Sequence, residues 1–98
     1  MKHFNKLTPG ELERISILAE ECAEVIQVIG KVLRHGYESK HPDGGPTNRE
    51  LLEEEIGHVF AAVDFLEEDD LDYDKIQDYR NRKHKTIAPY LHHQGIEL

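Results

Sequence analysis

The sequence predicts an all-α fold: an antiparallel helical bundle subunit with two long helices and a shorter third, forming a single domain over residues 1–98. Apolar residues recur at steps of three and four in three segments, which is the spacing of a helix face. Two of these segments open with a capping box. A hydrophobic content of 38% and a charged content of 33% suit one small folded domain. We expect helices at about 9–35, 48–68 and 73–88, a loop at 36–47 and a loosely held tail at 90–98.

The first helix has clear start and stop signals. Thr8 can cap it, Pro9 suits its first position, and Glu11 completes the capping box. Gly36 can end it. The stripe expected to pack, with Cys22 as a small buried residue in it, comprises Leu12, Ile15, Ala19, Cys22, Ile26, Ile29 and Leu33.

This helix is apolar over more than one stripe, because Ile17, Val25, Val28 and Val32 widen the face. A helix that is apolar nearly all round is buried nearly all round. Three helices in one short chain cannot easily surround it. We therefore expect the core to be completed by oligomerisation, as a homodimer or homotetramer.

The second and third helices follow the same logic. Thr47 and Glu50 form a second capping box, and the acidic run 67–70 ends the second helix. Asp72 can cap the third helix, which stops before Pro89. The apolar stripe of the second helix comprises Leu52, Ile56, Val59, Val63 and Leu66.

The charge balance excludes some partners. A net charge of −8 disfavours binding to nucleic acid polymers and to anionic membranes, which need a basic surface. No apolar run approaches the roughly 18 residues that span a bilayer. The polar start MKHFNKLTPG lacks the apolar region of a signal peptide. We expect a cytoplasmic protein without membrane partners.

Carboxylates interrupt the apolar pattern of the first helix. Ile17, Glu21, Glu24 and Val28 lie on one line, so the two glutamates are neighbours between apolar residues. At about 5–6 Å, two carboxylates repel by about 3 kcal/mol at an effective dielectric near 20. Partial burial adds a desolvation cost. Three forms of compensation are open: a raised pKa, a basic partner or a bound cation.

The second helix repeats this arrangement. Glu55 and His58 are three residues apart, on a line that also holds Leu51, Ala62 and Phe65. If the two long helices pack antiparallel, four ligand side chains converge. Such a density of carboxylate oxygens suits Mg²⁺ or Mn²⁺. The predicted metal ligands are Glu21, Glu24, Glu55 and His58.

The segments EECAE (20–24) and EEEIGH (53–58) resemble the E-E-x-x-E, spacer, E-x-x-D pattern of the all-α nucleoside triphosphate pyrophosphohydrolases of the MazG type. The resemblance covers the two long helices and their connector, and the loop is similar to those of small phage and bacterial members. It implies helical dimers or tetramers that hydrolyse an NTP or dNTP to NMP and pyrophosphate with Mg²⁺. It also implies a bacterial cell or a phage-infected host as the setting.

The resemblance also implies roles for individual residues. Glu21 and Glu24 match the first metal-binding pair, and Glu55 matches the glutamate of E-x-x-D. Glu54 matches a residue that orients or deprotonates the attacking water, which makes it the catalytic candidate. Arg80 and Lys83, at i and i+3 on the cationic third helix, are the candidates for binding the substrate phosphates.

His58 departs from the family pattern, because it occupies the aspartate position. Replacing an oxygen ligand by nitrogen should weaken Mg²⁺ and favour Mn²⁺ or a softer metal. Three outcomes stay open: an active enzyme with altered metal preference, a weak enzyme, or an inactive relative that only binds nucleotides. A phosphoribosyl-nucleotide pyrophosphohydrolase and a non-catalytic helical interaction protein are the alternative functions.

Overall fold

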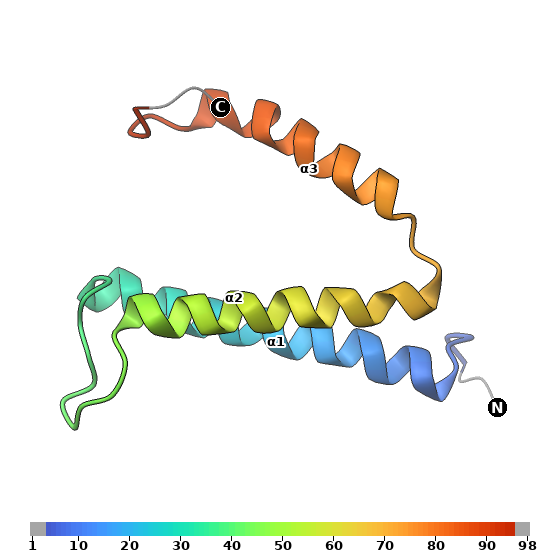
Figure 1. Ribbon diagram of the computed structural model, residues 1–98, viewed down its shortest axis with the longest axis horizontal. Coiled ribbons are helices and arrows are strands. Elements are labelled where there is room, and N and C mark those ends of the chain that lie inside the picture. Colours follow the sequence, from blue (N-terminus) through green and yellow to red (C-terminus); the bar gives the residue numbers. More distant parts are fainter. Residues whose placement is uncertain (1–3, 96–98) are drawn as a thin grey trace.

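The computed structural model describes residues 4–95, and all its regular elements are helical (Figure 1). The prediction of an all-α protein with two long helices and a shorter third is confirmed. The elements are the α-helices α1 (Pro9–His35), α2 (Asn48–Phe65) and α3 (Tyr73–Ile87), and the 3₁₀ helices η1 (Leu66–Asp69) and η2 (Ala88–Tyr90).

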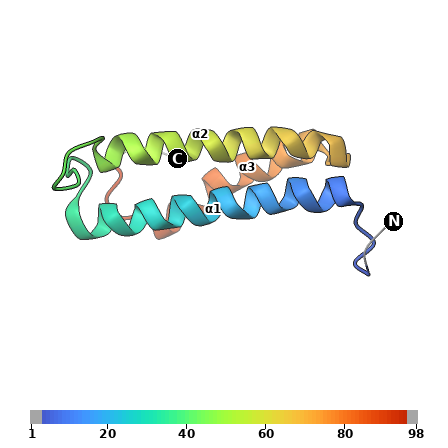
Figure 2. The same cartoon turned by 90° about the horizontal axis from the view of Figure 1, so that it is seen from below.

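Helices α1 and α2 form an antiparallel hairpin, lying side by side along their length (Figure 2). Both predicted capping boxes are present. Thr8 Oγ1 accepts a hydrogen bond from the Glu11 amide at 3.1 Å, and the Thr8 amide donates to Glu11 Oε1 at 2.8 Å. Thr47 and Glu50 make the same reciprocal pair, each at 3.1 Å. These local bonds fix where each helix begins.

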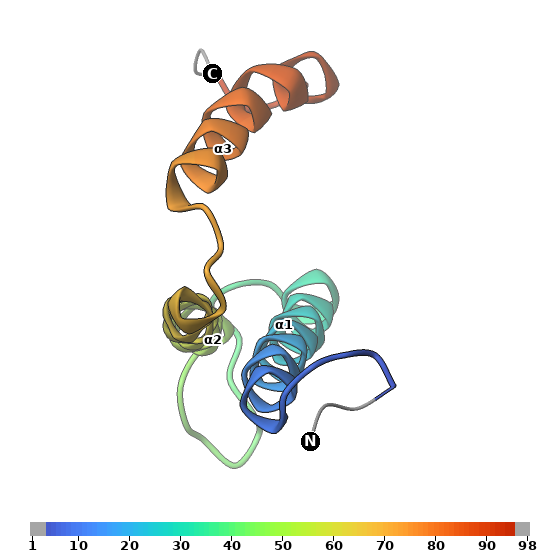
Figure 3. The same ribbon diagram turned by 90° about the vertical axis from the view of Figure 1, so that its right-hand side faces the viewer.

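Helix α3 stands away from the hairpin and packs on neither α1 nor α2 (Figures 1 and 3). It begins where Asp72 caps it by accepting from the Lys75 amide at 3.1 Å. The hydroxyl of Tyr73, at its first residue, donates to Asp64 on α2 at 3.3 Å. The radius of gyration is 17.3 Å, whereas a compact chain of this length has about 13 Å. The single chain is therefore an open shape.

The face of α1 that packs against α2 is not the one that the apolar pattern predicts. Val28 is buried on the carboxylate line, whereas Ile26 and Leu33 of the expected stripe are 69% and 81% exposed. Cys22 is exposed too, which corrects the expectation that it is buried. The reason is that α1 has one neighbour in the chain, so only one of its two apolar stripes is covered. Among residues 4–95, the buried apolar residues are Val28, Ala62 and Leu66.

The end of α2 differs slightly from the expectation of a helix to residue 68. The α-helix stops at Phe65 and continues as the 3₁₀ helix η1. There Asp69 accepts two hydrogen bonds from the Arg14 guanidinium, one of them from Nε at 2.9 Å. This ion pair ties the end of the acidic run to the first turns of α1. Part of the tail expected to be loose, residues 96–98, lies outside the described residues, whereas η2 includes Tyr90.

In the described part of the chain, no helix combines the length and the apolar character needed to cross a membrane.

Candidate metal centre

The hairpin brings four side chains to one point in the α1–α2 seam. Glu21 and Glu24 come from the middle of α1, and Glu55 and His58 come from the middle of α2. Each offers one ligand atom, and these four atoms all lie within 4.8 Å of one another. The antiparallel packing of two helices, each with polar groups at i and i+3, produces this convergence. We call this group of four residues the acidic cluster.

Two oxygens of the acidic cluster are buried without a hydrogen-bond partner. They are Oε2 of Glu21 and Oε2 of Glu55. His58 Nδ1 lies beside both oxygens, at 3.5 Å from the first and 3.4 Å from the second. These distances exceed those of a good N–H···O hydrogen bond. Because buried polar atoms are normally satisfied, two such oxygens beside the same imidazole make this group a candidate ligand site.

The close approach of the carboxylates in the acidic cluster shifts the pKa of Glu55. The pKa of the Glu55 carboxyl is raised above its usual range, first because Glu24 shares a hydrogen bond only with its protonated form. Burial and the charge of Glu24 raise this pKa further, and His58 opposes the change. In the absence of a cation, the seam therefore disfavours the ionised form of Glu55.

The four ligand atoms fit a divalent cation after a small contraction. Ligands at about 2.1 Å from Mg²⁺ are at most about 4.2 Å apart, so a pair at the 4.8 Å limit of this group would close by about 0.6 Å. A cation supplies the attraction for that movement, since it screens the repulsion between the carboxylates. Three carboxylates and one imidazole suit Mn²⁺ better than a set of oxygens alone would.

The acidic cluster is open to solvent on one side. The side chain of His58 is 47% exposed, whereas those of Glu21 and Glu55 are 22% and 15% exposed. A ligand can thus approach past His58 without unfolding the hairpin. The two glutamates form the floor of the site.

Other predicted site residues are not brought to the acidic cluster. Glu54 is exposed and precedes Glu55, so it projects about 100° away around α2. Arg80 and Lys83 are exposed on α3, which packs on neither helix of the hairpin. Within one chain, these two cations are therefore not phosphate ligands of the acidic cluster. The role of Glu54 stays a prediction.

Sequence reasoning missed Asn48, whose side chain joins the two ends of the loop. It is buried, 6% exposed, and its Nδ2 donates to the Gly36 carbonyl at 3.0 Å. The backbone amide of Asn48 also donates to the Ser39 carbonyl at 2.9 Å. A signal existed in the sequence: an asparagine beside the cap Thr47 can bond backbone groups of a nearby turn. These bonds hold the hairpin closed at the end of the seam.

Comparisons of the chain with protein-family models, with curated proteins and with solved structures found no match. The family resemblance of the two glutamate segments therefore enters the functional argument as a proposal, beside the geometry of the acidic cluster.

Proposed function

We propose that this protein is a metal-dependent nucleotide pyrophosphohydrolase, which hydrolyses an NTP or dNTP between the α and β phosphates to NMP and pyrophosphate. One observation carries the proposal: buried oxygens of Glu21 and Glu55 without hydrogen-bond partners belong to a group of four side chains whose ligand atoms converge. The resemblance of segments 20–24 and 53–58 to the MazG type supplies the substrate class.

The acidic cluster can do the work that this reaction needs. A divalent cation would supply charge neutralisation for the phosphates and a more acidic water molecule. Phosphoryl chemistry depends largely on such positioning and charge neutralisation. Glu21, Glu24, Glu55 and His58 would hold the cation, and the exposed side at His58 would admit the substrate. Glu54 is the proposed base on the resemblance alone, since its exposed side chain projects away from the acidic cluster within one chain.

A second copy of the chain is part of the proposal. The apolar stripe of α1 that faces away from α2 is uncovered, as are several aromatic side chains of α2 and α3. Burying a leucine or isoleucine contributes about 1.5–3 kcal/mol, so this surface favours association as a homodimer or homotetramer. In such an assembly α3 can pack against another hairpin. Arg80 and Lys83 could then approach the acidic cluster of a neighbouring subunit.

A second function is favoured by His58. Its Nδ1 lies at 3.4–3.5 Å from both buried oxygens, so a protonated imidazole can serve as their counter-ion in place of a metal. The protein would then be a non-catalytic nucleotide-binding or interaction protein. A phosphoribosyl-nucleotide pyrophosphohydrolase is the enzymatic alternative, since the same residues suit either pyrophosphate bond.

Pyrophosphate release tests these functions. The pure protein is incubated with each NTP and dNTP and with a phosphoribosyl nucleotide, in Mg²⁺ or Mn²⁺. We expect turnover with at least one metal, and a loss of about 100-fold or more in Glu24→Gln and in Glu55→Gln, as when a catalytic electrostatic group is removed. Glu20→Gln and Glu53→Gln remove the same charge from exposed neighbours and should retain activity.

The outcomes separate the functions. Activity that survives both cluster substitutions would remove the acidic cluster from the mechanism. No turnover with any metal would favour the non-catalytic function. Hydrolysis of the phosphoribosyl nucleotide alone would select the enzymatic alternative.

A further inference from the structure

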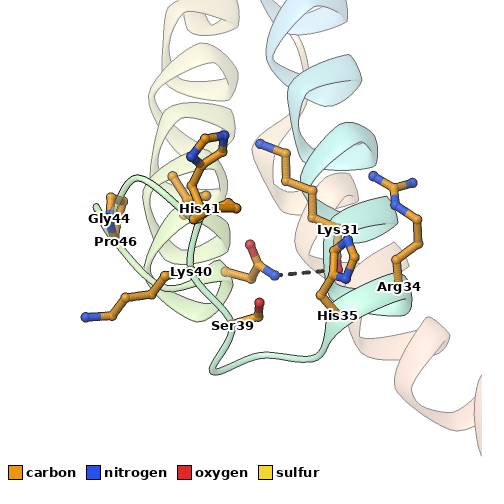
Figure 4. A pocket seen from close by; sticks show the side chains of 11 residues that line it. Lys31, Arg34, His35, Ser39, Lys40, His41, Gly44 and Pro46 are labelled. Atoms are coloured by element: carbon orange, nitrogen blue, oxygen red, sulfur yellow. Dashed lines mark hydrogen bonds between the residues drawn. The ribbon is translucent and has the colours of Figure 1, made fainter.

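A pocket lies at the loop end of the hairpin, separate from the acidic cluster. The last turns of α1, the 36–47 loop and the first turn of α2 enclose it, with a volume of about 410 Å³ (Figure 4). That volume is in the range of sites for small ligands. Pro42, Pro46 and Leu51 supply apolar wall, and Ser39 and Asn48 supply polar groups.

The pocket is positive in a negative protein. Three permanent cations line it, Lys31, Arg34 and Lys40, together with His35 and His41, and no Asp or Glu is among the lining residues. The whole chain has 20 acidic and 12 basic residues, so this wall is enriched in cations against the trend. Among residues 4–95, no ion pair joins any of these three cations to a carboxylate. Cations that line a hollow attract anions to it.

The end of α1 explains only part of this charge. Arg34 and His35 occupy its last turn, where cations offset the helix dipole with or without a ligand. Lys31 lies a turn earlier and Lys40 lies in the loop, so the dipole does not account for them. In Figure 4 Lys31 and His41 extend toward the same side of the pocket, whereas the Lys40 ammonium points outward. The Arg34 guanidinium lies on the outer side of α1, next to Gly30. Substitution of Lys31 therefore gives the most direct test of anion binding in this pocket.

The loop that forms the wall is held by hydrogen bonds. The Gly44 amide donates to the His41 carbonyl at 2.8 Å. The backbones of Lys40 and Thr47 form an isolated antiparallel β-bridge across the loop. The loop carboxylates have other neighbours: Glu38 Oε1 accepts from Arg49 Nε at 2.7 Å, and Asp43 lies beside His41 at 3.6 Å. A pocket formed in advance needs little reordering when a ligand binds.

The pocket and the acidic cluster lie along the same seam. Lys31 is seven residues after Glu24, or about 10 Å along α1, and Leu51 is four residues before Glu55, or about 6 Å along α2. We propose that this pocket binds the oligophosphate end of a nucleotide through Lys31, and that the Arg34 side chain turns from its place beside Gly30 to join it. The natural ligand rests on the proposed function, whereas the capacity of the pocket to bind a phosphate chain does not.

Calorimetry of tripolyphosphate binding in the presence of EDTA tests the pocket without the metal. We expect saturable binding, weakened about tenfold or more in Lys31→Gln/Arg34→Gln, since hydrogen bonds to charged groups are strong. Lys75→Gln/Lys85→Gln removes two exposed cations from α3 as the matched control and should change affinity less than about twofold, because screened distant charges contribute little. Glu24→Gln/Glu55→Gln should still bind tripolyphosphate.

No binding, or an equal loss in both double variants, would overturn the pocket assignment. An uncharged nucleoside that binds as well as tripolyphosphate would also overturn it, since the pocket would then recognise the base. The two proposals fail separately: binding without any hydrolysis contradicts the enzymatic proposal alone, and hydrolysis without metal-free binding contradicts the pocket alone. Tripolyphosphate binding and nucleotide hydrolysis can both be measured on the same purified protein.

Discussion

The two faces of α1 reverse the usual arrangement of a helix in a small protein. The face that packs on α2 carries Glu21 and Glu24, which are half-buried, whereas the opposite face carries Ile26 and Leu33, which are exposed. Packing inside the chain is thus used to assemble a polar group, and apolar surface is left uncovered. The difference teaches that the two apolar stripes of α1 have different neighbours, and it makes the proposed oligomer and the proposed metal site separately testable.

The largest effect should come from placing charge on the outer face. We expect Ile26→Glu/Leu33→Glu to reduce an oligomer to single chains, because losing the burial of two such side chains costs about 3–6 kcal/mol per subunit. Light scattering gives the mass, which should fall to 11.3 kDa. Gln27→Glu adds charge to the polar flank of α1 and should leave the assembly intact. A wild-type mass equal to one chain would contradict the proposal that the exposed apolar face of α1 contacts another copy.

The next effect concerns the end of the inner seam. Asn48→Ala removes a buried side chain and leaves the Gly36 carbonyl without its donor. We expect a loss of about 1–3 kcal/mol in the free energy of unfolding, the usual cost of an unsatisfied buried group. Urea denaturation measures it, and Asn81→Ala on exposed α3 is the control. Equal midpoints for the two variants would contradict the role of Asn48 in closing the hairpin.

The inner face should also show opposed effects on stability and function. Because the pKa of Glu55 is raised, its ionised form is disfavoured in the fold, and Glu55→Gln should raise the Tm of the metal-free protein. For the same reason, the metal-free wild type should lose stability as the pH rises from the ordinary carboxyl pKa through the raised one. Added Mn²⁺ should stabilise the wild type and not the variant. A variant less stable in EDTA would contradict this account.

The smallest change is His58→Asp, which replaces nitrogen by oxygen at the open side of the acidic cluster. We expect the ratio of Mg²⁺ to Mn²⁺ affinity to increase, since Mg²⁺ prefers oxygen ligands. Competition between the two metals, followed by the paramagnetic resonance of free Mn²⁺, measures the ratio. An unchanged ratio would show that His58 is not a ligand and would favour its role as a counter-ion.

Local patterns allowed the elements and the four side chains of the acidic cluster to be predicted from the sequence. Capping boxes and i, i+3 spacing act within a few residues, so Thr8, Thr47 and the glutamate pairs needed no knowledge of the tertiary structure. The packed face of α1 was not predictable in this way. Two apolar stripes competed for one neighbour, and the stripe containing Cys22 was left exposed.

Contacts between distant residues were also beyond local reasoning. Arg14 and Asp69 are far apart in the sequence and meet only because the hairpin ends coincide. Likewise, the basic pocket exists only when the loop closes over the end of α1, which brings Lys40 and His41 near Lys31. Helix α3 packs on neither α1 nor α2, so neither Arg80 nor Lys83 could be placed by spacing alone.

The chain has an open shape, with a radius of gyration of 17.3 Å. If its core is completed by other copies, the stability of the folded state depends on protein concentration. If copies complete one another's cores, dilution removes the apolar cover and the folded state together. Thermal melting should then shift upward with concentration, and catalysis should appear only above a threshold abundance. The activity of such a chain would then depend on its abundance in the cell, and the protein would be inactive at low concentration.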